Sequence, residues 1–512
     1  MSEDYLEIGG QKEDNLVLSA KGGATAFVLK ISATALGFLN QIILARILGA
    51  GGVGEVLLAI SVINITAQLA RFGMESAMMR FIPLYIEKRD KARLKGTIYF
   101  VLKFCSLLSI FFVSLILLFS KFISIDVFHS DGLLKLLPII AISLPASVIR
   151  GVIGGVLKGY NDALKALLPE FLILPLFRVM IFLLLSLQGA SPLYAVVAFI
   201  LGEVFAMILS IIFLFKKINK IKTLEYKSEY KKVFNVASTM ILTGFSAFLF
   251  TEADIWIVGM FTSIEAVGIY GVTVKLVALV IFSLGALSNV IPPLMSSVHA
   301  SGDRNELRRV VSESTRWILS MSIPIILILI LEGNFILKYL FGEKFANGYT
   351  ALVILSIGQL INAGSGLVGY LLQMTGGHKI LMKINIFWGI LNVILNIILV
   401  PRLGIIGAAL STAFCLAMVN IVSVIVVYNR LSVLTLAKGL KFDFVFIAVV
   451  AFLYLICRYM NFYMGYHLLL ISSIIVYIWK SIANDDLPWR LLLAKTKPYE
   501  STVYLRRRKY DK

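Results

Sequence analysis

Long apolar stretches are the feature of this chain that most restricts its fold. About fourteen of them lie between polar breaks, and each approaches the roughly 20 residues that a helix needs to cross a bilayer. They contain internal Gly and Pro and lack the alternation of barrel strands, so the pattern predicts transmembrane helices. The predicted spans are 24–46, 54–74, 98–119, 133–155, 166–187, 192–215, 233–260, 266–296, 310–331, 347–373, 380–400, 404–428, 442–460 and 466–483.

Composition excludes a soluble protein. Hydrophobic residues make up 59% of the 512 residues and charged residues only 15%, which lies outside the range of soluble domains. The spans place about 290 residues in hydrocarbon, so the arm, connections and tail that remain are too short for a folded catalytic domain. We therefore predict an all-α integral membrane protein that is not an enzyme.

The distribution of basic residues predicts the orientation of the chain. The net charge of +19 would also suit nucleic-acid binding, but the Lys and Arg residues gather on one side of the predicted topology. With a cytoplasmic N-terminus, about 34 of the 48 cations fall on the cytoplasmic side, which is the positive-inside bias. Both termini are thus predicted to be cytoplasmic in a multi-pass protein of the cell (inner) membrane. The tail run Arg506–Lys509 would face anionic headgroups.

Cysteine, histidine and phosphate-loop patterns predict neither a metal nor a cofactor. Cys105, Cys415 and Cys457 fall inside or at the edge of predicted spans, with neither a plausible pairing nor metal-ligand spacing. The four His residues are scattered over separate connections, which argues against a metal cluster. The chain also lacks the Gly-x-x-x-x-Gly-Lys-Ser/Thr pattern of a phosphate-binding loop, so ATP hydrolysis of that kind is excluded.

The chain resembles itself at a fixed offset. Asn40 precedes Gly54 by fourteen residues in the first half, and Asp254 precedes Gly268 by fourteen residues in the second, so both offsets are 214. Each repeat holds an even number of spans and enters the membrane from the same side. This arrangement predicts two six-helix lobes related by a parallel pseudo-two-fold axis, with two C-terminal helices outside the repeat.

The repeat divides the chain into six predicted parts. These are a cytoplasmic N-terminal arm (1–23), an N-lobe (24–215), a basic cytoplasmic linker (216–232), a C-lobe (233–428), spans thirteen and fourteen (429–483), and a basic cytoplasmic tail (484–512). The linker carries seven lysines in seventeen positions, and we expect it to lie on the membrane surface as a basic amphipathic helix.

Three segments resemble a known family. Ala-Arg-Ile-Leu-Gly-Ala-Gly-Gly-Val-Gly-Glu (45–55), Thr-Glu-Ala-Asp-Ile-Trp-Ile-Val-Gly (251–259) and Ala-Val-Gly-Ile-Tyr-Gly-Val-Thr-Val-Lys-Leu (266–276) look like the Wzx-type polysaccharide-biosynthesis flippases. These belong to the multidrug/oligosaccharidyl-lipid/polysaccharide (MOP) exporter superfamily, which also holds MurJ and MATE. The resemblance implies a flippase that moves polyprenyl-pyrophosphate-linked oligosaccharide to the outer leaflet by alternating access. It also implies a polysaccharide polymerase and a chain-length regulator as partners, and a lipid-tail groove at spans thirteen and fourteen.

Charged residues inside the predicted spans are the candidate functional residues. An ionised group near the bilayer centre costs at least about 2.5 kcal/mol, so such residues face a cavity or a partner. Guanidinium and ammonium groups in a wet cavity can replace the hydration of a pyrophosphate. The substrate-binding candidates are Arg178, Lys275, Lys30 and Arg150, whereas Arg71, Lys103 and Arg316 lie close enough to a boundary to snorkel.

Acidic residues also lie inside the predicted spans. Asp254, Glu203 and Glu252 are the candidate gating or coupling groups, and Glu170 is a further acid that accompanies the cations. Asp254 and Lys275 lie at similar depth on consecutive spans, which predicts an ion pair, either constitutive or opened by phosphate or a proton. Glu203 and Arg178 form a second predicted pair, in which Glu203 could carry a coupling proton. Glu252 lies about 200° around the helix from Asp254, so the two acids should face different neighbours.

Glycine and proline mark predicted packing and kink sites. Gly151, Gly155 and Gly159 recur at four-residue spacing, which predicts close approach of another helix. Pro138 and Pro145 in the same span are predicted kinks.

Two other function classes remain open at this point. An integral-membrane polymerase, ligase or glycosyltransferase would need paired carboxylates or metal ligands on a sizeable loop, and the longest outside connections have only about sixteen residues. A MATE-like, cation-coupled exporter of small organic cations is the second alternative. It would favour an acidic and aromatic cavity, whereas the cations outnumber the acids in these spans.

Overall fold

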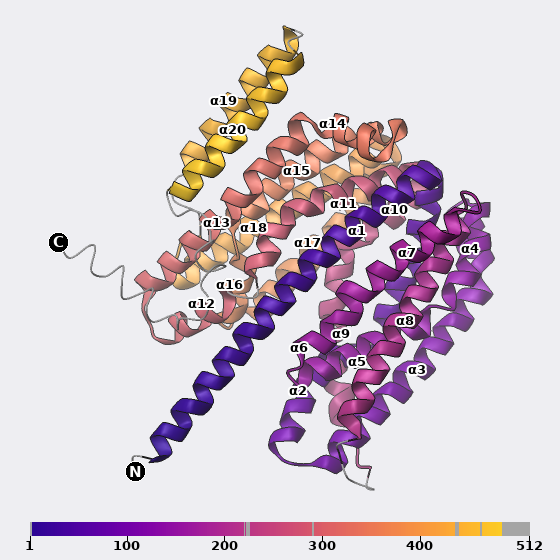
Figure 1. Cartoon of the computed structure of the whole chain (residues 1–512), viewed down its shortest axis with the longest axis vertical. Coiled ribbons are helices and arrows are strands. Elements are labelled where there is room, and N and C mark those ends of the chain that lie inside the picture. Colours follow the sequence, from indigo (N-terminus) through magenta and orange to yellow (C-terminus); the bar gives the residue numbers. More distant parts are fainter. Residues whose placement is uncertain are drawn as a thin grey trace, which may run out of the picture.

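The computed structural model describes residues 3–219, 221, 226–288, 291–435, 440–460 and 463–483, and every regular element in these ranges is helical. The first half contains α1 (Glu3–Arg71), α2 (Met74–Glu87), α3 (Lys91–Lys121), η1 (Phe122–Val127), α4 (Asp131–Ala141), α5 (Leu144–Gly159), α6 (Ala163–Leu168), η2 (Pro169–Ile173), α7 (Leu174–Ser186) and α8 (Pro192–Ile218). Figure 1 shows most of these helices gathered on one side of the molecule.

Most of the second half gathers on the other side, while α9 (Tyr230–Thr251) lies beside helices of the first half (Figure 1). The second half contains α9, α10 (Ala253–Phe261), α11 (Ile264–Leu287), α12 (Ile291–Ala300), α13 (Arg304–Leu331), α14 (Gly333–Ile336), η3 (Leu337–Phe341), η4 (Glu343–Gly348), α15 (Tyr349–Ser365), α16 (Val368–Met374), α17 (His378–Leu403) and α18 (Ile405–Leu431). A hairpin of α19 (Leu440–Tyr459) and α20 (Tyr463–Ala483) completes the described chain. The tail run Arg506–Lys509 lies outside the described residues.

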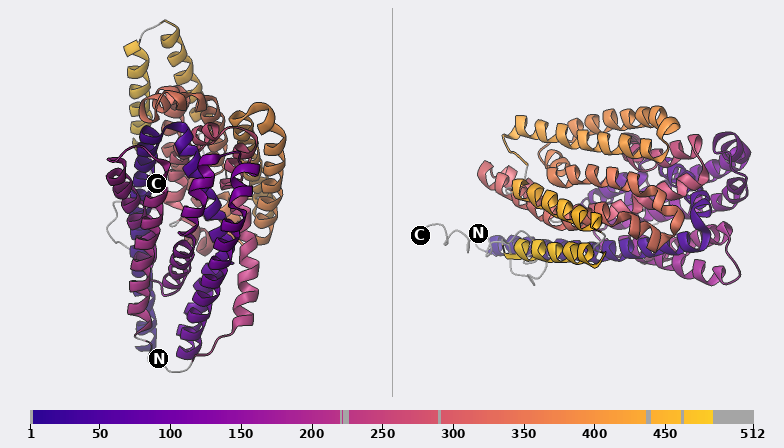
Figure 2. Two further views of the ribbon diagram at one scale, coloured as in Figure 1. Left: turned by 90° about the vertical axis from the view of Figure 1, so that its right-hand side faces the viewer. Right: turned by 90° about the horizontal axis from the view of Figure 1, so that it is seen from above.

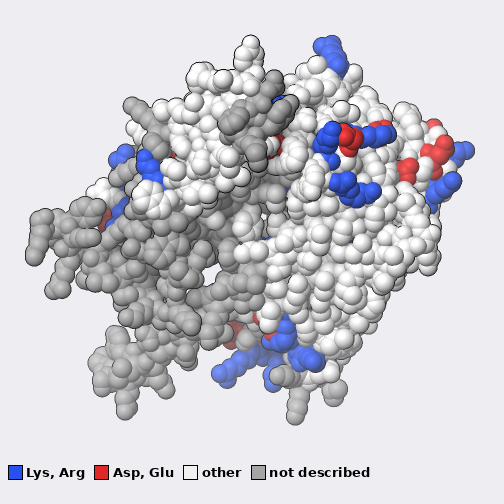
Figure 3. Space-filling view, turned by 45° about the horizontal axis from the view of Figure 1, so that its top comes forward, with Lys and Arg blue, Asp and Glu red and all other residues white. Residues whose placement is uncertain are grey.

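The helices have the length and composition of membrane spans. Among the described residues, eight helices are long and apolar enough to cross a bilayer, or up to ten if each bent pair is one span. The prediction of a multi-pass, all-helical membrane protein is therefore confirmed, while the count of about fourteen spans stays a prediction. Figure 3 shows charged side chains at the margins of one face, with a broad uncharged surface between them.

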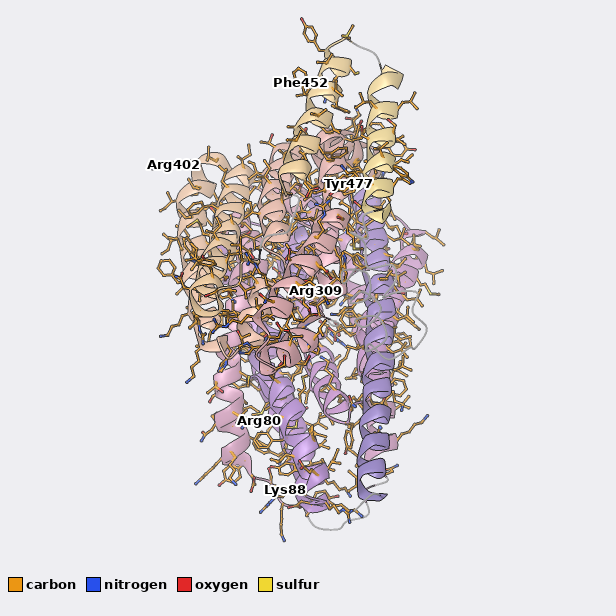
Figure 4. All side chains as sticks on the ribbon, turned by 90° about the vertical axis from the view of Figure 1, so that its left-hand side faces the viewer. Arg80, Lys88, Arg309, Arg402, Phe452 and Tyr477 are labelled. Atoms are coloured by element: carbon orange, nitrogen blue, oxygen red, sulfur yellow. The ribbon has the colours of Figure 1, made fainter. Side chains whose placement is uncertain are left out.

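One end of the first half is rich in lysine and is called the basic end below. It carries the turn between α2 and α3, with Lys88 and Lys91, and the last turn of α8, with Lys216 and Lys217. In Figure 4, Lys88 and Arg80 lie towards this end, and Arg402 and Phe452 lie towards the opposite end. The charges at the basic end match the side that the sequence predicts to be cytoplasmic.

Helix α1 contains the first two predicted spans in one element. It is broken only by Gly49, whose φ of 66° and ψ of −177° are not helical and lie where glycine is favoured over other residues. The helix already begins at Glu3, so residues 3–23 of the predicted arm are helical, and the cytoplasmic position of the arm stays a prediction. No proline occurs between Glu3 and Gly49, and nothing in this segment forces the helix to start later.

Two spans in the middle of the halves are bent. Helices α4 and α5 meet at 51° and helices α15 and α16 at 41°. The first break lies beside Pro145, which has no backbone N–H to continue the helix. Gly366 allows the second break, with a φ of 65°. The kink predicted in the fourth span is thus confirmed.

The predicted glycine packing is also confirmed. A Cβ atom at Gly155 would collide with the backbone carbonyl of Glu75 in α2, and one at Gly151 would collide with the Arg71 side chain. Gly159 lies against Met78 and Ile82 in the same way. Helix α5 therefore approaches α2 at backbone distance, which only glycine permits.

A reciprocal glycine contact joins the two halves where α1 crosses α11. A Cβ atom at Gly54 would collide with the carbonyl of Ile264, and a Cβ atom at Gly268 would collide with the carbonyl of Ala50. The two glycines differ in number by 214, and so do Ala50 and Ile264. Beside this crossing, the Arg46 guanidinium donates to the carbonyls of Tyr339 and Leu340 in η3, at 2.8 Å for Leu340.

The described part of the connection between the halves is helical only where α8 ends and α9 begins. Residue 221 and residues 226–229 are non-helical in the described part. The Lys227 N–H donates to the carbonyl of Ala92 at 3.2 Å, and Glu229 lies 3.5 Å from Arg93. A hydrogen bond from Lys232 and the charge of Arg93 hold the pKa of the Glu229 carboxyl below its usual range. These contacts hold residues 227–229 against the start of α3, and the expected contact with the membrane surface stays a prediction.

The C-terminal hairpin is attached to α13 by two polar contacts. In the middle of α13, Arg316 forms an ion pair with Asp443, which also accepts a hydrogen bond from the Tyr477 hydroxyl at 3.0 Å. At the C-terminal end of α13, Glu332 accepts a hydrogen bond from Tyr454 at 3.0 Å and lies 2.7 Å from His467. Figure 2 shows the far end of the hairpin projecting beyond the other helices.

Candidate functional site

A buried carboxylate in the first half holds two guanidinium groups. Glu203 on α8 is only 2% exposed. Its Oε1 atom lies 2.9 Å from Arg178 on α7, and its Oε2 atom lies 2.9 Å from the Nε atom of Arg150 on α5. The predicted Glu203–Arg178 pair is therefore confirmed. The sequence did not predict Arg150 as a second partner, because residues 53 positions apart share no local pattern.

Neighbouring residues fix the Arg178 side chain. Its guanidinium carbon lies 3.9 Å from the centre of the Phe199 ring, a cation–π contact. Gly202 leaves room for the side chain, since a Cβ atom there would approach the Cγ atom of Arg178 to 3.0 Å. On the other side of the cluster, Arg150 lies 3.8 Å from Glu170.

Arg178 also lines a small pocket between α1, α7 and α8. The pocket is lined by Asn40, Leu44, Val56, Ile60, Arg178, Phe182, Ala195, Ala198 and Phe199. The Nε atom of Arg178 is buried and has no hydrogen-bond partner among the described residues. A buried donor without a partner carries most of its desolvation cost, about 1–3 kcal/mol or more for a charged group, so a bound acceptor would be favoured there.

A second cluster of charged side chains lies next to this one, towards the basic end. Glu75 lies 3.0 Å from Lys158 and 3.2 Å from Arg71. The sequence analysis missed Glu75 and Lys158 because both lie in predicted connections or at span ends. The glycines of α5 were the available signal, since they bring α5 against the turn of α2 that carries Glu75.

Asp254 on α10 is buried among neutral donors and not paired with Lys275. It is 5% exposed, and its Oδ1 atom accepts hydrogen bonds from Asn392 at 3.1 Å and Asn396 at 2.9 Å. Its Oδ2 atom accepts from Tyr270 at 3.0 Å and from Thr412. The predicted Asp254–Lys275 pair is thus wrong, because Asp254 faces α17 and α18. Matching depth along two helices does not fix their rotation.

The Asp254 environment is rich in oxygen. The Oδ1 atom of Asn396 is buried without a hydrogen-bond partner among the described residues, and Thr412 places a hydroxyl beside the carboxylate. Carboxylate, amide and hydroxyl oxygens suit a hard cation, and a carboxylate without a cationic partner can also accept a proton. No group of three His, Cys, Asp or Glu residues suited to a metal occurs in the described chain.

The remaining candidate residues lie on helices next to the junction of the halves. Glu252 accepts a hydrogen bond from Asn64 of α1 at 3.2 Å, and it faces away from the partners of Asp254, as predicted. Lys275 on α11 is exposed and interacts electrostatically with Glu252. Lys30 on α1 is half-buried. The structure therefore brings Arg150, Arg178 and Glu203 together, and Lys275 near Glu252, while Lys30 belongs to neither group.

A family model described as a polysaccharide biosynthesis protein matches residues 43–350, which is more than half of the chain. The chain belongs to this family. The match includes α2 to α14 and both buried carboxylates, Glu203 and Asp254.

Curated relatives are named as flippases or transporters. The chain is similar to the probable low-salt glycan biosynthesis flippase Agl15 of Haloferax volcanii, with 24% identity over 412 residues that cover 78% of this chain and 81% of that protein. It is also similar to a putative O-antigen transporter of Shigella flexneri, with 24% identity over 74% of this chain and 90% of that protein.

Solved structures share the fold. The lipid II flippase MurJ, in an inward closed conformation, matches with a TM-score of 0.71 and 18% identity over 90% of this chain and 98% of that chain. An inward-facing MATE family multidrug resistance transporter matches with a TM-score of 0.61 and 15% identity over 81% of this chain and 94% of that chain. This member of the polysaccharide biosynthesis family therefore shares the fold of these two transporters.

Proposed function

We propose that the protein is a flippase that moves polyprenyl-pyrophosphate-linked oligosaccharide from the cytoplasmic to the outer leaflet for cell-surface polysaccharide biosynthesis. The observation that carries the proposal is the pair Arg150 and Arg178 on the single buried carboxylate of Glu203, beside a pocket. The second carboxylate near Arg150, that of Glu170 at 3.8 Å, is 44% exposed, so two guanidinium groups share one buried carboxylate inside an apolar slab, where charge is kept for function. The names of the relatives support the same substrate class.

The transport cycle in this proposal is alternating access between two lobes. The basic end is cytoplasmic, because cytoplasmic connections carry the excess of Lys and Arg, and both termini lie on that side of the cell membrane. Residues 24–215 and 233–428 are the two lobes, and the basic segment 216–232 links them. The cytoplasmic tail is residues 484–512.

The pyrophosphate contacts are Arg178 and Arg150 first, followed by Lys275 and Lys30. Guanidinium groups bind phosphate oxygens through charge-assisted hydrogen bonds, and the exposed ammonium of Lys275 is available to a substrate in the same way. Phosphate oxygens compete with the Glu203 carboxylate for the two arginines. Protonation of Glu203 would release them, so Glu203 can link substrate binding to a proton.

Asp254 and Glu252 are the other coupling and gating acids. Asp254 accepts a coupling proton or a monovalent cation among its amide and hydroxyl neighbours. Glu252 gates the junction of the halves through Asn64 and the nearby charge of Lys275. No part of this mechanism needs a resident cofactor or a covalent intermediate.

The hairpin α19–α20 forms the wall of a groove for the lipid tail in this proposal. Its outward apolar residues, such as Phe452 and Leu455, are exposed, and hydrocarbon is their natural contact. A polysaccharide polymerase and a chain-length regulator are the proposed protein partners, on family resemblance alone.

The experiment is a flip assay in proteoliposomes with a fluorescent polyprenyl-pyrophosphate oligosaccharide. We expect the wild type to move the lipid, and Arg178→Ala and Lys275→Ala to slow it at least about tenfold, since each removes a charge-assisted contact of about 1.5–3 kcal/mol. Arg402→Ala is the matched control, because Arg402 is an exposed cation in the last turn of α17. A wild type that moves no lipid but expels a cationic dye would replace the flippase by the MATE-like exporter.

A further inference from the structure

The pocket beside Arg178 and the site around Asp254 occupy equivalent positions in the two halves. Asp254 and its four hydrogen-bond partners all have a counterpart among the residues that line the pocket. The five pairs are Asn40 and Asp254, Val56 and Tyr270, Arg178 and Asn392, Phe182 and Asn396, and Ala198 and Thr412, and the two numbers in every pair differ by 214. A coincidence would not place the complete set of partners at one offset, so the two sites are copies of one ancestral site.

The two copies have opposite charge. In the second half the charged group is the Asp254 carboxylate, and position 392 is a neutral amide. In the first half position 40 is a neutral amide, and position 178 is a guanidinium. The hydroxyl and amide groups of Tyr270, Asn396 and Thr412 are replaced by apolar side chains in the first half. The first copy therefore lacks the polar side chains that surround the Asp254 carboxylate and carries a fixed cation instead.

The Arg178 side chain is arranged to receive an anion. Glu203 holds one of its terminal nitrogens at 2.9 Å, and Phe199 covers its face at 3.9 Å, so the guanidinium cannot rotate freely. Its Nε–H is left without a partner in the described chain, and the Asn40 amide is the other polar group among the pocket residues. Two N–H donors in an apolar wall are suited to an oxygen that carries negative charge.

We infer that the Asn40–Arg178 pocket is an oxyanion site that binds a phosphate oxygen, as the charge-reversed copy of the Asp254 site. This inference deepens the proposed function, because it names Asn40 as a substrate contact and assigns the phosphate group to the first half. The phosphate can come from the headgroup of a lipid-linked sugar or from free inorganic pyrophosphate. Both sources present the same oxygen to Arg178.

The test measures binding to the full-length protein in lipid nanodiscs by titration calorimetry. The probes are inorganic pyrophosphate and a short-chain polyprenyl pyrophosphate, titrated separately into wild type and Asn40→Asp. The substitution has the shape of the native side chain but places a carboxylate beside Arg178, as Asp254 stands beside Asn392. We expect at least a tenfold loss of affinity, because the new acid pairs with Arg178 and repels phosphate.

A matched control separates this effect from that of any new acid. Asn362→Asp changes a half-buried amide in α15, bonded to Gln359, and should leave the affinity within twofold. Arg178→Asn gives the first copy the residue of the second and should abolish binding. Thermal melting of each variant checks the fold, and Asn40→Asp keeps the test decisive if Arg178→Asn does not fold.

The outcomes distinguish this site from the proposed function. Binding of either probe that Asn40→Asp weakens tenfold supports the oxyanion site, and preference for the lipid probe identifies the headgroup as the source. Unchanged affinity for both probes in Asn40→Asp, or no binding of either probe to wild type, overturns it even if wild type flips lipid. Conversely, a protein that binds the probes through Asn40 and Arg178 but flips no lipid retains the site and loses the flippase function.

Discussion

The two halves of the molecule each bury one carboxylate, yet they surround it differently. Glu203 is 2% exposed and Asp254 is 5% exposed, so burial does not distinguish them. Glu203 meets two guanidinium groups, whereas Asp254 meets two amides and two hydroxyls. The first acid cannot lose its charge without stranding two cations, while the second can accept a proton or a cation at no such cost. The identity of the partners, and not depth, therefore decides how each acid can couple: Glu203 can be protonated only when phosphate takes over its two arginines, whereas Asp254 can accept a proton or a cation without another ligand.

Removing the charge of Glu203 should have the largest effect on the folded protein. Glu203→Gln leaves Arg178 buried without a counter-charge and Arg150 with only the more distant Glu170, and loss of one partner of a buried pair costs about 3–5 kcal/mol. We expect a marked fall in thermal stability in detergent, measured by fluorescence-detected size exclusion after heating. The double variant Glu203→Gln/Arg150→Gln should recover part of this loss. A melting temperature equal to that of wild type would show that the pair contributes nothing.

The same change at Asp254 should spare the fold and affect transport. Asp254→Asn keeps the shape and can still accept from Tyr270 and Thr412, so the stability change should stay near about 1 kcal/mol. Transport driven by a proton or sodium gradient should fall at least about tenfold if the coupling step needs the charge. The assay compares lipid transfer with and without each gradient. Gradient-driven transfer at the wild-type rate would exclude Asp254 from coupling.

The contact between Gly54 and Gly268 allows a test of the symmetry between the two halves. Gly54→Ala and Gly268→Ala each add a methyl group against a carbonyl of the other half, and overpacking of this kind costs about 1–3 kcal/mol. Because the contact is reciprocal, the two losses of stability should be equal within error. Gly37→Ala on the same helix as Gly54 is the control, since its added Cβ meets nothing within 4 Å. Clearly unequal losses would refute the symmetric contact.

The smallest effect is expected in the hairpin, which has no counterpart in the repeat. Tyr477→Phe removes one hydrogen bond to Asp443, and hydrogen bonds between transmembrane helices contribute about 0.6 kcal/mol on average. The change should be visible in a denaturant titration in micelles but not in the melting of the rest of the protein. A loss comparable to that of Glu203→Gln would mean that the hairpin is integral to the core.

The helices, the charged sites and one ion pair could be predicted from the sequence, because each follows from a physical rule that acts over short stretches of chain. Apolar length determines which segments enter a membrane, so the helical class followed directly. Arg178 and Glu203 pair as predicted because consecutive spans joined by a short connection are neighbours. The glycine spacing in α5 likewise determined a contact surface by itself. Each of these features depends on residues close in sequence or on one helix face.

The partners of Asp254 could not be predicted in the same way. Asn392, Asn396 and Thr412 are 138 to 158 positions away, on helices whose order in the bundle the sequence leaves open. Depth along the membrane suggested Lys275, but depth says nothing about rotation about the helix axis. The repeat did hold the missing information, since the offset of 214 relates every partner to a pocket residue. This offset identifies the partners of Asp254 only when the residues of one of the two sites are already known.

The contact between Gly54 and Gly268 determines how pH and salt affect the junction of the halves. The atoms that meet there are backbone atoms and a methyl group of Ile264, and each atom pair contributes about 0.1–0.2 kcal/mol of dispersion energy. Separation at this point breaks no titratable contact and rotates no side chain. Breaking this contact should therefore be independent of pH and nearly independent of salt, so any dependence of lipid transfer on either must originate at charged residues outside the crossing.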